Sequence, residues 1–280
     1  MDFSKILIVS DYDGTLTGPD HIIPETNRRA IRAFMEQGGA FAIGSGRGVS
    51  MQREILEDFP VNAPCICSNG SVLYDFSKKE LISLTAFSAE EMEKVAEVVD
   101  HDMTIHDCVI IEAGTDDYYL PSEVDARFDV EKEGAEDPEK RWVLSQIIRE
   151  NTKIVPVRET DGQWVKLSFY VSEDNMEHLA KACQEKGLNG QKSWGTLYEL
   201  QPIGINKGVG ARKLAKILGR EVLVCIGDEE NDLAMLEAAD LAFVTDSAKP
   251  SMRARGYLPC APCQDGAVAD VIRQLKELPS

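Results

Sequence analysis

Short apolar runs alternate with helical patterns at the start of the chain, and this alternation narrows the possible folds more than any other feature. Apolar runs at 6–9, 41–43 and 65–67 predict strands. Between them, the patterns at 24–37 and 50–58 predict helices, the first closed by a glycine pair. Strands joined by helices are typical of a parallel sheet in an α/β domain.

The same alternation returns at the other end of the chain. A buried strand ends at Gly227-Asp228, and helices are expected before and after it. The expected elements are helices at 207–218, 233–239 and 268–278 and strands at 222–226 and 241–244. Both ends therefore favour one Rossmann-like α/β domain with a parallel sheet.

The middle of the chain has a different pattern, because consecutive strand-like runs occur there together. An acidic stretch at 116–140 is expected to be solvated surface of variable structure. We expect an inserted α+β module at 84–195 and a core formed by 1–83 and 196–280. The elements expected in this middle part of the chain are helices at 88–99 and 173–186 and strands at 154–157, 164–171 and 198–200.

The net charge of −18 over 280 residues limits the partners that suit this chain. Such a charge gives no broad field to attract a phosphate backbone, so neither nucleic acid nor an anionic membrane surface is expected as a partner. No obligate protein partner is evident either. A small ligand fits better, and an anionic one would need a metal ion or individual Lys and Arg side chains in its pocket.

Cysteine usage and the N-terminal sequence favour the cytoplasm. Seven cysteines are an odd number and are scattered through the chain, which is typical of reduced thiols. The apolar run at 6–9 is too short for a secretory signal, and no segment has the apolar length that spans a bilayer. Cys260 and Cys263 form a CAPC motif, which is interpreted as ordinary thiols, with a redox or metal role left open.

Acidic and polar side chains follow several of the expected strands. Asp11 and Asp13 come directly after the first strand, and as alternate residues they can reach toward one pocket. Ligands bind at the carboxyl ends of strands in open α/β sheets. The other residues placed at strand ends or helix starts are Ser45, Asn69, Asp228, Asp232 and Lys207.

Converging carboxylates predict a bound cation. Without compensation they would repel one another and their pKa values would rise, and an oxygen-preferring divalent ion resolves this conflict. Mg²⁺ is the expected ion, since zinc would prefer Cys and His ligands that this set of residues lacks.

Four ordered motifs carry a resemblance to a known family. DYDGTLT at 11–17, SGR at 45–47, Lys207 and GDEEND at 227–232 resemble the motifs of the haloacid dehalogenase-like hydrolase superfamily. SNG at 68–70 and YELQPIGINKG at 198–208 further resemble its Cof-like sugar-phosphatase branch with a type IIB cap. The resemblance implies a phosphatase whose inserted cap chooses the substrate and closes over the core.

By this resemblance, Asp11 is the nucleophile that forms an aspartyl phosphate. Asp13 is the general acid and base, and its main-chain carbonyl also binds Mg²⁺. The resemblance gives the remaining roles as follows: Asp11 and Asp228 bind Mg²⁺, Ser45, Gly46 and Lys207 bind phosphate, and Asn231 and Asp232 position Lys207 and the waters of the metal. The implied substrate is a small phosphorylated metabolite, with a sugar phosphate favoured over nucleotide, flavin and vitamin-precursor phosphates.

Two other functions remain open from the sequence. A phosphomutase would use the same phospho-aspartate but return the phosphoryl group to a second hydroxyl. A non-catalytic binding or regulatory protein could keep the fold alone. Gly44, Gly46 and Gly48 only faintly suggest dinucleotide binding, because Val49 stands where the third glycine is needed.

Overall fold

The protein is described by a computed structural model, which covers the chain except for residues 58, 60, 102–107, 126–151, 194–195 and 279–280. The chain folds into two compact units. The first contains Met1–Arg47, Gln52–Ser83 and Asn206–Ser280, and the second contains Gly48–Met51 and Leu84–Ile205. Each unit has a sheet and a hydrophobic core of its own.

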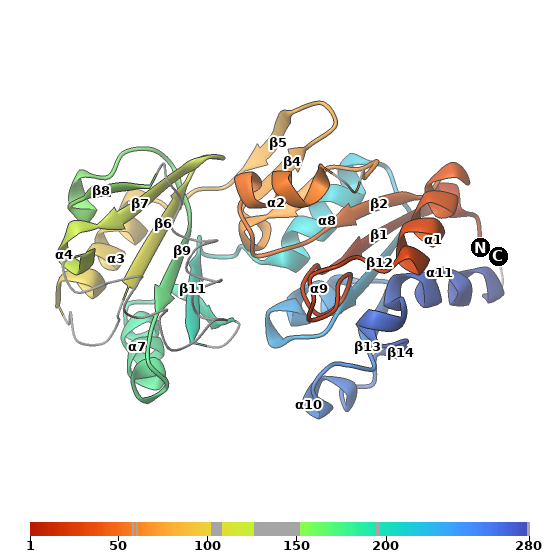
Figure 1. Cartoon of the computed structure of the whole chain (residues 1–280). Helices are drawn as coiled ribbons and strands as arrows, with labels where there is room; N and C mark the ends of the chain where they lie inside the picture. Colours follow the sequence, from red (N-terminus) through yellow and green to blue (C-terminus); the bar gives the residue numbers. More distant parts are fainter. Residues whose placement is uncertain (58, 60, 102–107, 126–151, 194–195, 279–280) are drawn as a thin grey trace. The chain divides into compact units, whose positions relative to one another are not determined.

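The first unit is built on a five-stranded sheet in the order β14-β13-β12-β1-β2 (Figure 1). Each neighbouring pair is parallel, which confirms the α/β core with a parallel sheet. The sequence pattern missed the edge strand β14, which is too short to show a period. The strands are β1 (Ile6–Ser10), β2 (Ala40–Ile43), β12 (Val222–Gly227), β13 (Leu241–Thr245) and β14 (Leu258–Cys260).

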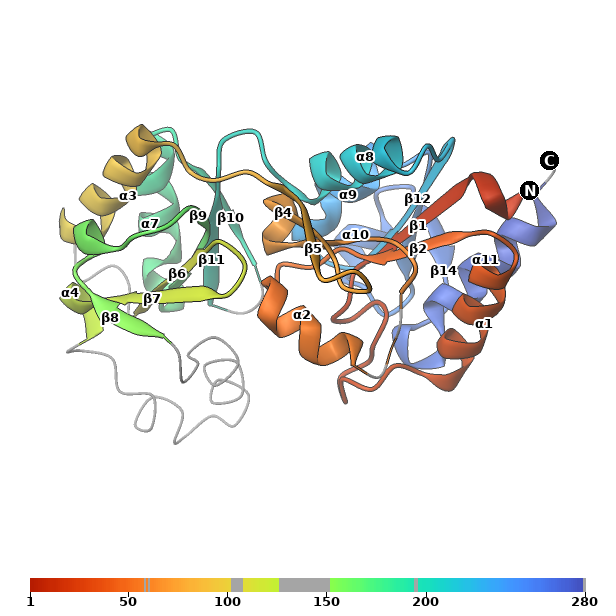
Figure 2. The ribbon, with the colours of Figure 1, turned by 90° about the horizontal axis from the view of Figure 1, so that it is seen from above.

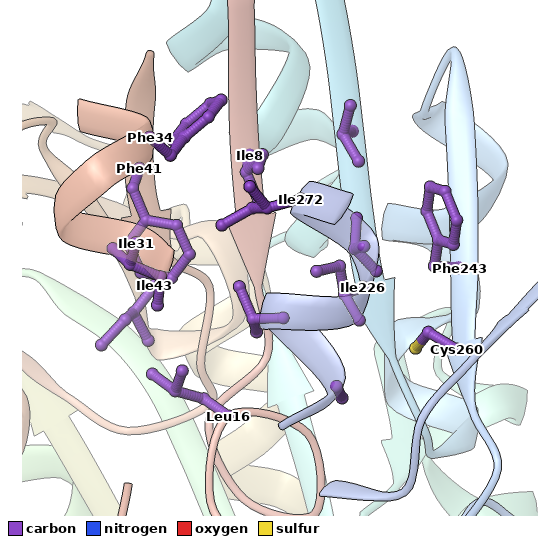
Figure 3. Close-up of a cluster of buried hydrophobic side chains, with 14 of the residues drawn as sticks. Ile8, Leu16, Ile31, Phe34, Phe41, Ile43, Ile226, Phe243, Cys260 and Ile272 are labelled. Carbon is purple, nitrogen blue, oxygen red and sulfur yellow. The ribbon is translucent and has the colours of Figure 1, made fainter. Parts of the chain in front are cut away.

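Helices cover both faces of this sheet. On one face, α1 (Glu25–Glu36) and α11 (Ala267–Glu277) pack on a core that includes Ile8 of β1 (Figure 3). On the other face, α8 (Lys207–Ile217) and α9 (Leu233–Ala238) pack on a core that includes Val9. Adjacent residues of β1 thus enter different cores, as the two-residue period of a strand requires. A strand buried on both faces explains its uninterrupted apolar run.

Smaller elements complete the first unit. A three-stranded sheet has the order β3-β4-β5, and α2 begins in the residues grouped with the second unit. The bounds are α2 (Val49–Leu56), α10 (Pro250–Arg253), β3 (Cys65–Cys67), β4 (Val72–Asp75) and β5 (Glu80–Leu84), with 3-10 turns η1 (Phe3–Lys5), η2 (Ser68–Gly70), η4 (Glu230–Asp232) and η5 (Cys263–Asp265).

The second unit contains a six-stranded sheet in the order β10-β11-β9-β6-β7-β8, with α3 and α7 packed on its apolar face (Figure 2). Only β7 and β8 pair in parallel among the pairings described for this sheet. The strands are β6 (Cys108–Ala113), β7 (Asp117–Pro121), β8 (Lys153–Val155), β9 (Trp164–Tyr170), β10 (Asn189–Lys192) and β11 (Leu197–Gln201); the helices are α3 (Ala89–His101), α4 (Ser122–Asp125), α7 (Glu173–Glu185) and the 3-10 turn η3 (Val157–Glu159).

This unit differs from the sequence-based expectation in several details. The strands β6 and β10 were not among the expected elements. The stretch at 116–140 was expected to be surface, but Tyr118–Pro121 are buried in β7; residues 126–140 lie outside the described part of the chain. The core was expected to resume at 196, whereas the first unit resumes at Asn206. The reason is that β11 pairs with β9 and β10 and so completes the antiparallel sheet.

No helix in the described ranges combines the length and the apolar character that crossing a membrane requires.

Candidate active site

Asp11 lies at the carboxyl end of β1, next to the centre of the parallel sheet. Its backbone N–H donates to the carbonyl oxygen of Ile226 (2.9 Å), which extends the pairing of β1 with β12 by one residue. The Asp11 residue is only 7% exposed, and its Oδ1 accepts a hydrogen bond from Lys207 Nζ at 2.6 Å. The main chain therefore fixes the position of this carboxylate.

Lys207 begins α8 and lies buried between two carboxylates. Asn206 caps the helix by accepting a hydrogen bond from the Val209 amide (2.9 Å). Lys207 Nζ donates to Asp11 and, at 2.7 Å, to Asp232 Oδ1. Burial lowers the pKa of Lys207, but the two carboxylates outweigh burial and hold the pKa above its ordinary value. The ammonium is thus a fixed positive charge.

Asp232 orients the loop that follows β12. Its Oδ2 accepts hydrogen bonds from the backbone amides of Asp228 (3.0 Å) and Glu229 (3.2 Å). Gly227 is required here, since a Cβ at that position would lie 2.6 Å from the Cβ of Asp232. Asp228 in turn accepts a hydrogen bond from the Thr15 hydroxyl (2.5 Å). The loop is therefore held so that Asp228 faces the end of β1.

Asp11, Asp228 and Asp232 form a cluster that could hold a metal ion. Each offers a carboxylate oxygen, and these oxygens lie within 4.8 Å of one another. Burial, together with the charge of the neighbouring carboxylates, raises the pKa of Asp11 to about 7 and that of Asp228 to about 8. The single positive charge of Lys207 does not balance the negative charges of three carboxylates. The set of carboxylate oxygens therefore fits a divalent cation that prefers oxygen ligands.

Asp13 is held by two cationic or protonatable side chains that sequence reasoning did not connect to it. Arg47 donates from two nitrogens to its two carboxylate oxygens, at 2.9 and 3.0 Å. His21 Nδ1 lies 3.3 Å from Asp13 Oδ1. Burial raises the pKa of Asp13, but His21 and Arg47 outweigh burial and lower it to about 2. The position of Arg47 in the SGR motif was the only sequence signal for this contact.

Ser45 and Gly46 lie in the loop after β2. Ser45 is 3% exposed, its N–H donates to the Ile66 carbonyl (3.0 Å), and its Oγ accepts from the Arg47 amide (3.2 Å). A Cβ at Gly46 would lie 3.0 Å from Asn69 Oδ1 in η2, so the two loops approach closely. Asn231 is half-buried in η4, beside Asp232.

The structure thus brings together the side chains of Asp11, Lys207, Asp228 and Asp232, which come from three separate parts of the sequence. Asp13 is not one of the three carboxylates in the possible metal cluster, because its oxygens face Arg47 and His21. Thr15 is a further polar contact of the site that sequence reasoning missed. It belongs to the DYDGTLT run, which offered the one available signal.

The model of the haloacid dehalogenase-like hydrolase family matches residues 8–272. The chain belongs to this family. The match confirms the resemblance that the ordered motifs carried, and it makes the chain a hydrolase by family. The residues of the acidic cluster all lie within the matched range.

Relatives of this haloacid dehalogenase-like hydrolase are similar over nearly their whole lengths. The 5-amino-6-(5-phospho-D-ribitylamino)uracil phosphatase YcsE of Bacillus subtilis is 27% identical over 95% of this chain and 94% of its own. The HMP-PP phosphatase of Cronobacter sakazakii is 27% identical over 92% and 91%. The pyridoxal phosphate phosphatase YbhA of Escherichia coli is 23% identical over 90% and 92%.

Solved structures share the fold of the haloacid dehalogenase-like hydrolase at lower identity. One from B. subtilis has a TM-score of 0.78 and 20% identity and covers 96% of this chain and 99% of its own. A sugar phosphatase of subclass IIB has a TM-score of 0.77 and 17% identity and covers 97% and 99%. These likenesses confirm the fold class.

Proposed function

We propose that the chain is a Mg²⁺-dependent phosphatase that hydrolyses small phosphate monoesters through a phospho-aspartyl intermediate on Asp11. The observation that carries the proposal is the pairing of buried Asp11 with Lys207 at 2.6 Å inside a cluster of three carboxylates. As a haloacid dehalogenase-like hydrolase whose named relatives are phosphatases, the chain is a phosphoric monoester hydrolase.

In the first step the free carboxylate oxygen of Asp11 attacks phosphorus. The new Asp11–phosphorus bond forms as the ester oxygen leaves, and Asp13 gives that oxygen a proton. Because His21 and Arg47 lower the pKa of Asp13 to about 2, Asp13 must first take up this proton from solvent when the anionic substrate binds beside it.

Lys207 favours the ionised form of Asp11 and holds the carboxylate in place, and its positive charge also faces the phosphate. A Mg²⁺ ion held by Asp11, Asp228 and the Asp13 carbonyl, with Asp232 behind them, would offset the repulsion between these acids and an anionic phosphate.

In the second step water attacks the phosphorus of the aspartyl phosphate. Asp13 takes a proton from that water, the bond between phosphorus and the Asp11 oxygen breaks, and inorganic phosphate leaves. The two hydrogen bonds from Arg47 would orient the Asp13 carboxylate between these two steps. Ser45, the Gly46 amide and Asn231 would hold the phosphate oxygens during both.

Sugar phosphates are the proposed substrates, and the second unit is proposed to choose among them. Support comes from the fold shared with a sugar phosphatase, although named relatives act on other small phosphorylated molecules such as pyridoxal phosphate. A cytoplasmic location is also proposed, because Cys65, Cys67, Cys183, Cys225, Cys260 and Cys263 are all unbridged.

Asp11→Asn tests the proposal. It removes the nucleophile but keeps the shape, so phosphate release from a panel of metabolite phosphates should fall roughly 10,000-fold or more. The circular dichroism spectrum should not change. Glu36→Gln, at an exposed position in α1, makes the same chemical change away from the site and should retain full turnover. Full turnover by Asp11→Asn would refute the assignment.

Metal removal and product analysis separate this proposal from its rivals. Wild-type turnover should disappear in EDTA and return with excess Mg²⁺. Phosphorus NMR should show free phosphate, whereas an isomerised sugar phosphate would identify a phosphomutase. A wild-type protein that releases phosphate from no ester with Mg²⁺ present would leave only a non-catalytic role.

A further inference from the structure

Gln52 of α2 is fully buried, and its side chain contacts the main chain of Arg47. Its exposed fraction is 0%. Its Nε2 donates hydrogen bonds to the main-chain carbonyl oxygens of Ile66 (2.8 Å) and Arg47 (3.3 Å). Because both partners are acceptors, the NH₂ end of the amide, and not its oxygen, must face them. The Gln52 side chain thus joins the strand β3 to the main chain of Arg47.

Stability alone explains an amide at this position poorly. Gln52 Oε1 has no hydrogen-bond partner among the residues that the structure describes, and a buried acceptor without a partner is costly. Neither carbonyl oxygen depends on Gln52 as its donor. The Ser45 amide also donates to the Ile66 carbonyl, and the Ser68 amide also donates to the Arg47 carbonyl, each at 3.0 Å. A methionine would fill the same space without an unpaired acceptor, so the amide is best explained by its hold on Arg47.

Tyr12 holds the other end of Arg47. The guanidinium carbon lies over the Tyr12 ring, 5.5 Å from the ring centroid, and Tyr12 is only 6% exposed. An aromatic face attracts a guanidinium, and more strongly where water is excluded. From this position Arg47 donates to both carboxylate oxygens of Asp13. Arg47 is thus fixed by Gln52 at its main chain and by Tyr12 at its guanidinium, and a side chain fixed at both ends holds Asp13 in one orientation.

We propose that Gln52 and Tyr12 are positioning residues that fix Arg47, so that Asp13 can protonate the ester oxygen as it leaves. The inference rests on the proposed function, in which Asp13 is the general acid. A general acid must lie within hydrogen-bond reach of the oxygen that it protonates, and a misplacement of about 1 Å can cost about a hundredfold in rate. Loss of either contact should therefore weaken proton donation by Asp13 and leave the attack by Asp11 in place.

Two esters separate proton donation from the rest of the reaction. The alkoxide that leaves benzyl phosphate needs a proton, whereas p-nitrophenolate is a stable anion that leaves without one. The parameter kcat/KM reports the reaction up to cleavage of the ester bond. Gln52→Met keeps the length of the side chain but removes both N–H donors. We expect kcat/KM to fall about tenfold or more for benzyl phosphate and less than about threefold for p-nitrophenyl phosphate.

Stability is the second measurement, because a merely structural role for Gln52 would reduce it. The urea midpoint of Gln52→Met should equal that of the wild type, since each carbonyl oxygen keeps another donor. Gln184→Met, at an exposed position on α7, makes the same chemical change elsewhere and should keep the midpoint and both kcat/KM values. Equal losses of kcat/KM for the two esters in folded Gln52→Met would overturn the inference, and so would a lower urea midpoint with unchanged kcat/KM values.

Tyr12→Leu tests the contact at the guanidinium. It removes the aromatic ring that faces Arg47, so the ratio of kcat/KM for benzyl phosphate to that for p-nitrophenyl phosphate should fall about threefold or more. Tyr12→Phe keeps a ring in the same place and should restore most of that ratio. A wild-type ratio in folded Tyr12→Leu would overturn the role of Tyr12. If Tyr12→Leu does not fold, the result for Gln52→Met decides the inference.

Asp13→Asn shows whether a failure belongs to this inference or to the proposed function. It removes the acid itself, so kcat/KM for benzyl phosphate should fall further than in Gln52→Met and much more than kcat/KM for p-nitrophenyl phosphate. A selective loss in Asp13→Asn without one in Gln52→Met would overturn the positioning role alone. Equal losses for both esters in Asp13→Asn, or no phosphate release by the wild type from either ester with Mg²⁺ present, would overturn both.

Discussion

In each unit of the protein, a lysine is buried between two carboxylates, yet the two arrangements differ. Lys207 Nζ lies 2.6 and 2.7 Å from Asp11 and Asp232, and Lys166 Nζ lies 2.8 and 2.9 Å from Glu199 and Glu112. Asp228 adds a third acid to the first group, at the carboxyl ends of parallel strands. Lys166 lies instead in the middle of a mostly antiparallel sheet.

The difference shows how the topology of a sheet determines which role a buried cluster of charged side chains can have. At the carboxyl ends of the parallel strands, Asp232 is held by the backbone amides of Asp228 and Glu229, and Lys207 at the start of α8 holds Asp11 and Asp232. On the face of the second sheet, Lys166 of β9 pairs with Glu112 of β6 and Glu199 of β11, its two neighbouring strands. The first arrangement offers the oxygen donors that suit a divalent metal, and the second joins three neighbouring strands through buried ion pairs.

Lys207→Met should have the largest effect on activity. It removes the only lysine hydrogen-bonded to Asp11 among the described residues, so the nucleophile loses both its orientation and its charge balance. We expect kcat to fall about a thousandfold or more. Leaving Asp11 and Asp232 buried without the lysine between them should also cost about 3–5 kcal/mol of unfolding free energy. Urea denaturation and phosphate release measure the two effects.

Lys166→Met is the matched change in the second unit. Breaking a buried ion pair again costs about 3–5 kcal/mol, measured by urea denaturation. Activity should fall much less than in Lys207→Met, because Lys166 pairs with Glu112 and Glu199 and is not part of the cluster that holds Asp11. Equal losses of kcat in the two variants would contradict the contrast between the Lys207 cluster, which holds the proposed nucleophile, and the Lys166 cluster, which does not.

The sequence predicted the first cluster well because strand ends can be recognised locally. Asp11 and Asp228 each follow an apolar run, and parallel strands place such residues at one edge of a sheet. Lys207 could be assigned to the same cluster because it begins a helix pattern and takes its place in an ordered set of motifs. These local signals were enough to predict the fold class and the acidic residues near the end of β1.

The second cluster could not be predicted in the same way. The contacts of Lys166 depend on the register between β6, β9 and β11, and no local pattern fixes how antiparallel strands align. For the same reason, the sequence did not show that β11 pairs with β9 and β10, and the predicted domain boundary therefore lay at 196, before β11. The contacts of Asp13 with Arg47 and His21 were also missed, because they join loops through side-chain geometry that spacing does not encode.

Asp228→Asn should sharpen the comparison by acting on stability in the opposite direction. Asp228 is the carboxylate of the first cluster that does not pair with Lys207. Burial and the negative charges of Asp11 and Asp232 disfavour its ionised form. In EDTA, the variant should therefore gain about 1 kcal/mol of unfolding free energy, while losing activity with Mg²⁺. The Thr15 hydroxyl can still donate to the amide oxygen. A loss of stability in EDTA would mean that Asp228 is already compensated.

Glu91 offers a smaller test, because it is a buried carboxylate held by N–H and hydroxyl donors rather than by a buried lysine. It accepts hydrogen bonds from the Ser88 amide (2.7 Å), the Ser88 hydroxyl (2.6 Å) and the Ile203 amide (2.7 Å). Burial raises the pKa of Glu91, but these hydrogen bonds outweigh burial and lower it below its ordinary value of 4.5. Glu91 thus resembles a helix cap more than either lysine cluster.

Because the pKa of Glu91 is lower in the folded protein than in the unfolded chain, its contribution to stability is present above about pH 4.5 and is lost as the pH falls further. Glu91→Gln should therefore cost about 0.5–1 kcal/mol of unfolding free energy at neutral pH and progressively less at acidic pH. Glu90→Gln, whose side chain is 79% exposed, provides the control and should change stability less. Urea denaturation at a series of pH values measures both. A cost that stays constant down to acidic pH would show that the shape of Glu91, and not its charge, stabilises the start of α3.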